Sequence, residues 1–131
     1  MSIRLFILGL AISLFTSAVA NNKKGNGKVI THVTLTSYNP VKSQCWGDPT
    51  ITANGTKIDL KKLKRRQIKY CAVSRDLLWL FPLGSKVHIE GHGEYLVVDT
   101  MNVRFNHCMD ILQHVSEKNF KKEKVKVTKL R

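Results

Sequence analysis

Two aspartates in this sequence each stand in a run of apolar, strand-forming residues. Asp99 directly follows the run LVV, and Asp110 lies inside the run CMDIL. A carboxylate among apolar neighbours loses hydration, so its pKa rises, and each unit of that rise costs about 1.4 kcal/mol. A small domain avoids such a cost unless the acid has a task. Because a carboxyl group that stays protonated beside a second carboxylate can act as a general acid, we take Asp99 and Asp110 as candidate catalytic residues.

Each of these acids also has a structural interpretation. Asp99 could cap the turn at residues 100–102. Asp110 could be a buried acid satisfied by backbone N–H groups or by Arg104. A third acid, Asp76, follows Arg75 at the end of an expected strand, and we interpret it as a structural acid that caps the segment LLWLF.

The three cysteines, Cys45, Cys71 and Cys108, allow at most one internal disulfide and leave one thiol. Cys71 and Cys108 both lie in apolar, strand-like runs, and we expect them to be the pair. The chain contains no CxxC motif, so we predict no metal site, and we expect no cofactor.

The elements that must position these residues are mostly strands. Alternation of apolar and polar residues predicts six or so short strands. They lie in HVTLTSYNP, IKYCAVS, SKVHIEG, GEYLVVD, FNHCMDIL and VKVTKL. Between the first two strands, residues 41–57 are rich in turn formers and are expected to be a long loop.

Two short helices complete the expected domain. Asp59 is expected to cap one over DLKKLKRRQ, with Leu60 and Leu63 facing inward, and Ser116 to cap another over SEKNFKK. The segment RDLLWLFP is expected to be a compact turn or a helical segment, with Trp79 in the core. A single domain of such strands closes as a barrel or a sandwich, and the two aspartates favour a barrel with a cleft on its side or at its mouth.

The N-terminal residues have the pattern of an export signal. Residues 1–20 combine Arg4, an apolar stretch and a small-x-small end, which predicts a signal peptide cleaved after Ala20. An uncleaved anchor is the alternative. Residues 21–28 are expected to be a flexible basic leader, and residues 29–131 one domain. We therefore expect an exported protein, located in the periplasm or outside the cell at the wall, without stable membrane insertion.

The formal net charge of +13 predicts an anionic partner: cell-wall polymer, lipid head groups or nucleic acid. The cations cluster in DLKKLKRRQIK and KKEKVKVTKLR. A solvated basic surface is the alternative. Because the basic runs lack interleaved aromatic residues, we do not expect a nucleic-acid partner.

The sequence resembles a known family in the motifs that surround the aspartates. SYNP, TANG, CAVSRDL, PLGSKVHIEGHGEYLVVDT and RFNHCMDIL follow one another in the order of the 3D (three-aspartate) domain, over residues 33–127. The matching positions are Tyr38, Pro40, Thr52-Ala53-Asn54-Gly55, Ala72-Val73, Pro82-Leu83-Gly84, Gly91, Gly93, Asp99-Thr100 and Asp110.

This resemblance implies a mainly β fold, a six-stranded double-psi β-barrel. The family is related to the catalytic domain of membrane-bound lytic transglycosylase A and to the stationary-phase muralytic factors. Those proteins cleave the peptidoglycan glycan strand between N-acetylmuramic acid and N-acetylglucosamine and leave a 1,6-anhydro end.

The resemblance also implies roles for individual residues. It makes Asp110 the catalytic acid and Asp99 its partner in the cleft, and it places Thr52 and Tyr38 in the groove, although ordinary strand packing explains these two equally well. We further expect Thr100 and Arg104 to bind substrate. For Arg104, a pairing with Asp99 or Asp110 remains equally open.

One departure from the family pattern keeps two functions open. Where the family has D-T-G-G-A-I-K-G, this chain has DTMNVRFN, so the glycines that would let a sugar lie against the backbone are missing. The expected function is an exported, monomeric peptidoglycan lytic transglycosylase acting on glycan strands. The alternative is a non-catalytic, wall-binding barrel.

Overall fold

The structure is a computed structural model that describes residues 28–45 and 47–130. The predicted signal peptide, the leader up to residue 27, and Trp46 lie outside these ranges. No helix in the described part of the chain is long and apolar enough to cross a membrane.

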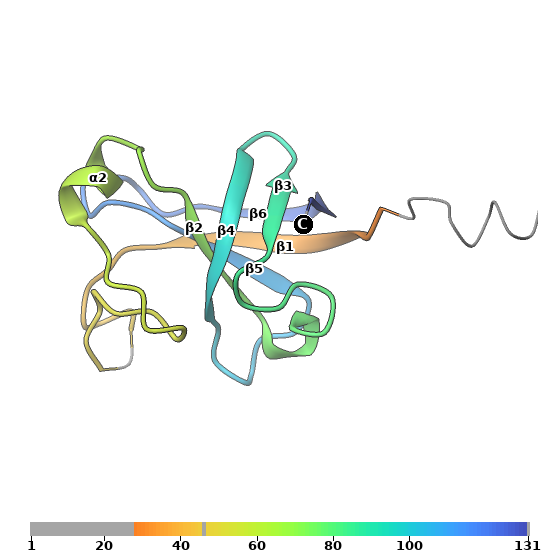
Figure 1. The fold of residues 1–131 in the computed structure, drawn as a ribbon, viewed down its shortest axis with the longest axis horizontal. Coiled ribbons are helices and arrows are strands. Elements are labelled where there is room, and N and C mark those ends of the chain that lie inside the picture. Colours follow the sequence, from red (N-terminus) through yellow and green to blue (C-terminus); the bar gives the residue numbers. More distant parts are fainter. Residues whose placement is uncertain (1–27, 46, 131) are drawn as a thin grey trace, which may run out of the picture.

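Six strands close into one barrel in the order β1-β5-β2-β4-β3-β6 (Figure 1). Their bounds are β1 Ile30–Tyr38, β2 Tyr70–Val73, β3 Lys86–Ile89, β4 Gly93–Thr100, β5 Cys108–Leu112 and β6 Lys121–Lys129. The pairs β1/β5 and β2/β4 are parallel, and the other four neighbouring pairs are antiparallel. The predicted mainly β, six-stranded barrel is confirmed.

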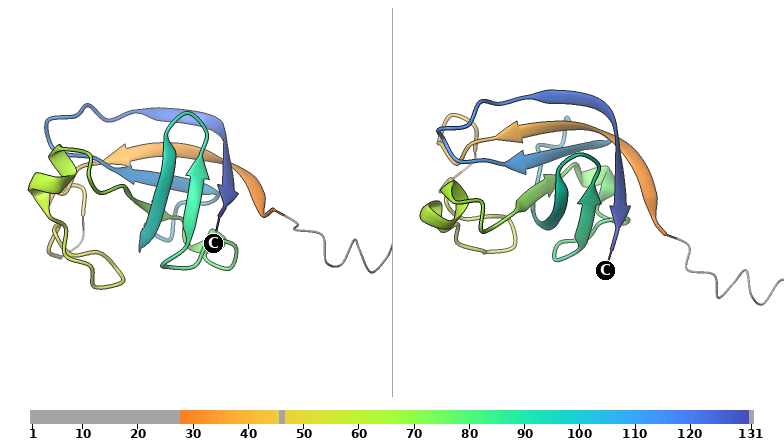
Figure 2. Two further views of the ribbon diagram at one scale, coloured as in Figure 1. Left: turned by 45° about the horizontal axis from the view of Figure 1, so that its top comes forward. Right: turned by 90° about the horizontal axis from the view of Figure 1, so that it is seen from above.

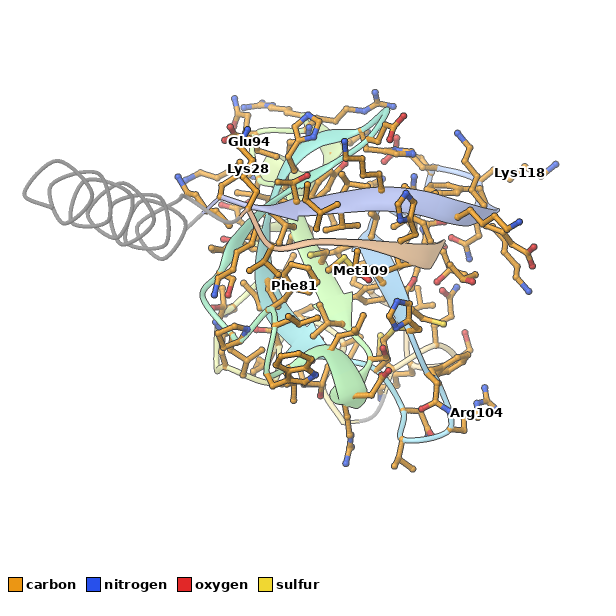
Figure 3. All side chains as sticks on the ribbon, turned by 90° about the vertical axis from the view of Figure 1, so that its right-hand side faces the viewer. Lys28, Phe81, Glu94, Arg104, Met109 and Lys118 are labelled. Carbon is orange, nitrogen blue, oxygen red and sulfur yellow. The ribbon has the colours of Figure 1, made fainter. Side chains whose placement is uncertain are left out.

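The barrel interior is filled by the apolar positions that alternate along the strands. In β3, Val87 and Ile89 are fully buried while His88 between them is exposed, as the alternation predicted. Figure 3 shows Phe81 and Met109 pointing into this interior. Full burial of such side chains contributes about 1.5–3 kcal/mol each, so this core holds the strands in register.

A second apolar cluster lies on the outer wall of the barrel. It consists of Tyr38, Ile58, Leu63, Ala72, Met101 and Leu112. Through it the helix α2 (Leu60–Lys64) and the segment before it pack beside the ends of β1 and β5 and the start of β2, as Figure 2 shows. This packing holds a long connection over the outer face of the sheet.

The short helix α2 begins as the sequence predicted. Asp59 is its N-cap, and its carboxylate accepts hydrogen bonds from the backbone N–H groups of Lys61 and Lys62. Leu63 is buried, but the prediction that Leu60 faces inward is wrong, because Leu60 is exposed. Leu60 is the first helical residue, and helical side chains lean toward the N-terminus, beyond the end of the covered surface.

Two further predictions are wrong. Residues 114–117 form a turn instead of the start of a helix, because the Ser116 hydroxyl bonds to the His114 ring at 2.8 Å and caps nothing. Trp79 is 79% exposed and not in the core. In the turn after the 3-10 helix η1 (Arg75–Leu77), Leu77 and Phe81 take the inward positions, which leaves Trp79 on the opposite side.

Candidate active site

The two aspartates lie in one row of residues that crosses four neighbouring strands. Thr36 of β1 is paired with Asp110 of β5, Asp110 with Ala72 of β2, and Ala72 with Asp99 of β4. Neighbouring strands lie about 4.8 Å apart, so the Cα atoms of Asp110 and Asp99 are roughly 10 Å apart, with Ala72 between them. Paired residues point to the same face of a sheet, so both carboxyl groups leave the sheet on the same side.

That side is the outer wall of the barrel. Met109 and Ile111, the neighbours of Asp110 along β5, belong to the interior core, so Asp110 points outward. Ala72 contributes only a methyl group and packs in the outer cluster. The small side chain leaves open space between the two acids.

Burial and its neighbours set the ionisation of Asp110. Burial raises the pKa of Asp110 to about 6, and the negative charge of Asp99 adds to this rise. A hydrogen bond from the Thr36 hydroxyl to Asp110 Oδ1, at 2.9 Å, opposes it. At pH 7 a carboxyl group with this pKa is protonated in about one tenth of molecules, roughly a hundredfold more than at an ordinary pKa of about 3.9.

Asp99 is held in a different setting. Its Oδ1 atom accepts hydrogen bonds from the backbone N–H of Ala53 at 3.0 Å and of Thr100 at 2.9 Å. Burial raises the pKa of Asp99, while these two N–H groups favour its ionised form. In this pair, Asp99 accepts two backbone hydrogen bonds that favour its carboxylate form, whereas Asp110 accepts no backbone hydrogen bond from the described part of the chain and binds a proton more readily.

Tyr38 brings a third polar group to the same place. Its side chain is buried, and its hydroxyl has no hydrogen-bond partner among the described residues. It lies near enough to Asp99 to lower the pKa of that carboxyl group. Burial raises the pKa of Tyr38, and the charges of Asp99 and Asp110 add to this rise. The Tyr38 hydroxyl is therefore a donor that is closed off from solvent and acts on Asp99.

The six residues predicted to act on substrate all line one groove of about 900 Å³. They are Asp110, Asp99, Thr52, Tyr38, Thr100 and Arg104. The groove is bounded by the outer wall of the barrel, by parts of the 39–45 and 47–59 segments, and by the β4–β5 connection. A volume of this size is typical of small-molecule and saccharide-sized sites.

Thr52 is engaged within its own turn. Its hydroxyl donates to Asn54 Oδ1 at 2.6 Å, and the backbone N–H of Asn54 donates to Val98 O at 3.2 Å. This turn presents the backbone N–H of Ala53 to Asp99. The hydroxyl of Thr52 therefore acts on the site through the position of Ala53.

Arg104 and Asp76 do not belong to the row of residues that contains Asp110 and Asp99. Arg104 makes no ion pair with either groove aspartate, and its guanidinium lies over the Phe105 ring at 4.8 Å. Asp76 does not line the groove. Both of its carboxylate oxygens accept from the backbone N–H of His107, at 2.9 and 3.2 Å, which fixes the chain just before β5.

The predicted disulfide between Cys71 and Cys108 is not formed, and Cys45 is also free. Cys71 is paired with Ile111, three residues along β5 from Cys108, a separation of roughly 10 Å at about 3.3 Å per residue. A disulfide requires Cα atoms within about 7 Å. In addition, Cys71 belongs to the interior core, whereas Cys108 packs against the outer cluster.

Four residues that the sequence analysis did not predict contribute to the site: Thr36, Ala72, Lys42 and Arg75. Thr36 contacts Asp110, and the other three line the groove. Ala72 lies in a motif matched by the family resemblance, which was its only signal. Among the described residues no cluster of three or more histidine, cysteine, aspartate or glutamate side chains could hold a metal ion.

Comparisons with known proteins add little to this geometry. No family model matches the sequence, and no curated protein matches it either. The solved structure of Streptomyces papain inhibitor (SPI) is similar to this chain with a TM-score of 0.49 and 15% sequence identity, over 79% of this chain and 96% of that chain. A likeness of this strength says nothing about activity.

Proposed function

We propose that this protein is an exported peptidoglycan lytic transglycosylase that cleaves the bond between N-acetylmuramic acid and N-acetylglucosamine. The observation that carries the proposal is the placement of Asp110 and Asp99 in one groove, with the pKa of Asp110 at about 6. The motif resemblance to the 3D domain supports it. We propose accordingly that the barrel is of the double-psi type and that the protein works as a monomer, without a cofactor, in the periplasm or at the cell wall.

The chemistry needs one carboxyl group that both gives and takes a proton. Protonated Asp110 donates its proton to the glycosidic oxygen as the bond to the anomeric carbon breaks. The resulting carboxylate then takes the proton of the C6 hydroxyl of the same muramic acid residue, whose oxygen attacks the anomeric carbon and closes the 1,6-anhydro ring. Because that hydroxyl belongs to the same sugar, no water has to be activated.

Asp99 supports this reaction through its charge. The transition state at the anomeric carbon is oxocarbenium-like, and a carboxylate in the same groove stabilises its positive charge. The N–H groups of Ala53 and Thr100 favour the ionised form of Asp99 that this role requires, against the burial that raises its pKa. The same charge helps Asp110 to hold its proton.

The second candidate function is a non-catalytic barrel that binds the wall. The chain TMNVRFN replaces the glycine-rich segment of the family, and in the structure Met101 from this segment packs into the outer cluster beside the groove. A side chain there occupies space that glycine would leave to a sugar. Binding without cleavage is the outcome that this candidate predicts.

The test is incubation of the mature protein with purified sacculi, followed by mass spectrometry of the soluble muropeptides. The wild type is expected to release products with 1,6-anhydro ends. The Asp110→Asn variant is expected to lose at least about 100-fold of this activity, since general acid catalysis typically contributes 10²–10⁴-fold.

An exposed aspartate outside the groove provides the control. Asp59→Asn keeps an N-capping side chain on α2 and leaves both groove acids intact, so it should retain the activity of the wild type. Sedimentation with sacculi but no released sugar, by wild type and Asp110→Asn alike, would favour the wall-binding barrel.

A further inference from the structure

Three cationic side chains line the groove without a carboxylate partner. They are Lys42, Arg75 and Arg104, and all three are exposed. In the described part of the chain the ion pair within 4 Å is Arg66 with Glu117, which lies outside this groove. Arg75 donates only a long hydrogen bond of 3.4 Å to the carbonyl of Met101, and Arg104 stacks on Phe105. Their charges are available to a ligand.

These cations lie apart from the acids. The two aspartates sit on strands at the base of the groove. Lys42 and Arg104 come from connecting segments around it, and Arg75 from the 3-10 helix η1. Figure 3 shows Arg104 on a loop that projects from the barrel, far from Met109 in the interior.

The ionisation of Asp110 is consistent with this separation. A cation within about 4–6 Å of a carboxyl group lowers its pKa. The pKa of Asp110 is instead raised, by burial and by Asp99, and the group that opposes the rise is the Thr36 hydroxyl. The groove therefore has an acidic base and a separate cationic rim.

This division restricts the chemistry of the ligand. A polymer with charge along its backbone, such as a polyphosphate, would bring negative charge against Asp99 and Asp110 at the base. An unsubstituted neutral glycan would fit the base but leave the rim without partners. A neutral chain that carries pendant carboxylates satisfies both parts, because arginine binds carboxylates with two parallel hydrogen bonds.

We propose that the groove selects glycan strands that still carry their acidic stem peptides, with Arg104, Arg75 and Lys42 binding the peptide carboxylates. The inference rests on the proposed function, because it assumes a glycan strand in the groove. It adds that the protein prefers peptide-bearing glycan strands over strands without peptides. It also assigns the three cations as the residues that determine this specificity.

The test separates binding from cleavage by using the Asp110→Asn variant of the full mature chain. Two probes are compared: soluble, fluorescently labelled glycan strands with their peptides, and the same strands after an amidase has removed the peptides. The lactyl carboxylates that this hydrolysis exposes on the muramic acid residues are converted to methylamides, so that the second probe is neutral. Each exposed ion pair contributes about 0.2–1 kcal/mol, so with three pairs the peptide-bearing strands are expected to bind roughly 3- to 150-fold more tightly in fluorescence anisotropy titrations.

A matched pair of substitutions identifies the rim. Adding Arg104→Gln is expected to weaken binding of peptide-bearing strands by about two- to fivefold and to leave peptide-free strands unaffected. Adding Arg65→Gln removes the same charge from the end of α2, outside the groove, and should change neither probe.

The outcomes distinguish the two proposals. Equal affinity for both probes, or an equal effect of Arg104→Gln and Arg65→Gln on the peptide-bearing strands, would overturn the selection for stem peptides while leaving the glycan site in place. No binding of either probe would overturn the proposed function and the inference with it.

Discussion

At the scale of single residues, the burial that raises the pKa of Asp110 also lowers the stability of the folded protein when Asp110 is ionised. A carboxyl group whose pKa is higher in the folded chain than in the unfolded chain is bound more tightly to its proton in the folded state. The folded state therefore loses stability as the pH rises from the unfolded value of about 3.9 through the folded value. Asp110, with a folded pKa of about 6, places this loss between about pH 4 and pH 7.

Asp110→Asn is accordingly expected to stabilise the protein at high pH. At pH 8 the gain in the free energy of unfolding should be about 1–3 kcal/mol, and at pH 4 it should be close to zero. Urea unfolding at both pH values measures this difference. Asp48→Asn, at an exposed aspartate whose pKa is lowered by its bonds to Thr50, should give no gain at pH 8. A gain for Asp110→Asn of the same size at both pH values would show that desolvation of its charge is not the cause.

The sequence predicted the acids themselves because of their local setting. A charged residue inside CMDIL or directly after LVV is visible without a structure. Thr36 carries no such signal, because it lies in an ordinary alternating strand and meets Asp110 only through the parallel pairing of β1 with β5. The prediction that Trp79 lies in the core was wrong because all of its neighbours in the sequence are apolar. Such a segment does not indicate which of its side chains point inward.

At the scale of elements, register is the decisive feature. The row from Thr36 to Asp99 depends on three strand pairings, and the pairing of β2 with β4 shifts by one residue between Cys71 and Ala72. Without that irregularity Asp99 would not be opposite Ala72. Alternation along each strand predicted which residues form strands, but it contains no information about which strands become neighbours.

The turn at residues 52–56 is the second element that the site requires. It holds the backbone N–H of Ala53 against Asp99, and the Thr52 hydroxyl closes it on Asn54. Thr52→Val removes that hydrogen bond from a buried position, which should lower the free energy of unfolding by about 1–2 kcal/mol. It should also speed amide hydrogen exchange at Ala53.

Thr56→Val is the matched control, since the Thr56 hydroxyl makes no described hydrogen bond while its backbone closes the same turn. Unchanged exchange at Ala53 in Thr52→Val would mean that the turn does not depend on this hydroxyl.

At the scale of the whole molecule, the barrel separates packing from chemistry. The interior is apolar and holds the strands together, whereas the acids, the small Ala72 and the unpaired Tyr38 hydroxyl lie on the outer wall. The long connection and the β4–β5 connection border part of that wall and turn it into a groove, and α2 packs on the wall beside it. The two aspartates in the sequence favoured a barrel with a cleft on its side or at its mouth, and the groove lies on its side.

The central claim is that Asp110 holds its proton to a pH well above the ordinary range of a carboxyl group, because it is buried and lies beside the charge of Asp99. A carbon-13 NMR titration of the carboxyl groups measures this directly, in the wild type and in Asp99→Asn, which keeps the oxygen that accepts from Ala53 and Thr100. We predict a pKa of about 6 for Asp110 in the wild type and a lower value in Asp99→Asn. An ordinary value of about 3.9 for Asp110 in both proteins would contradict the account.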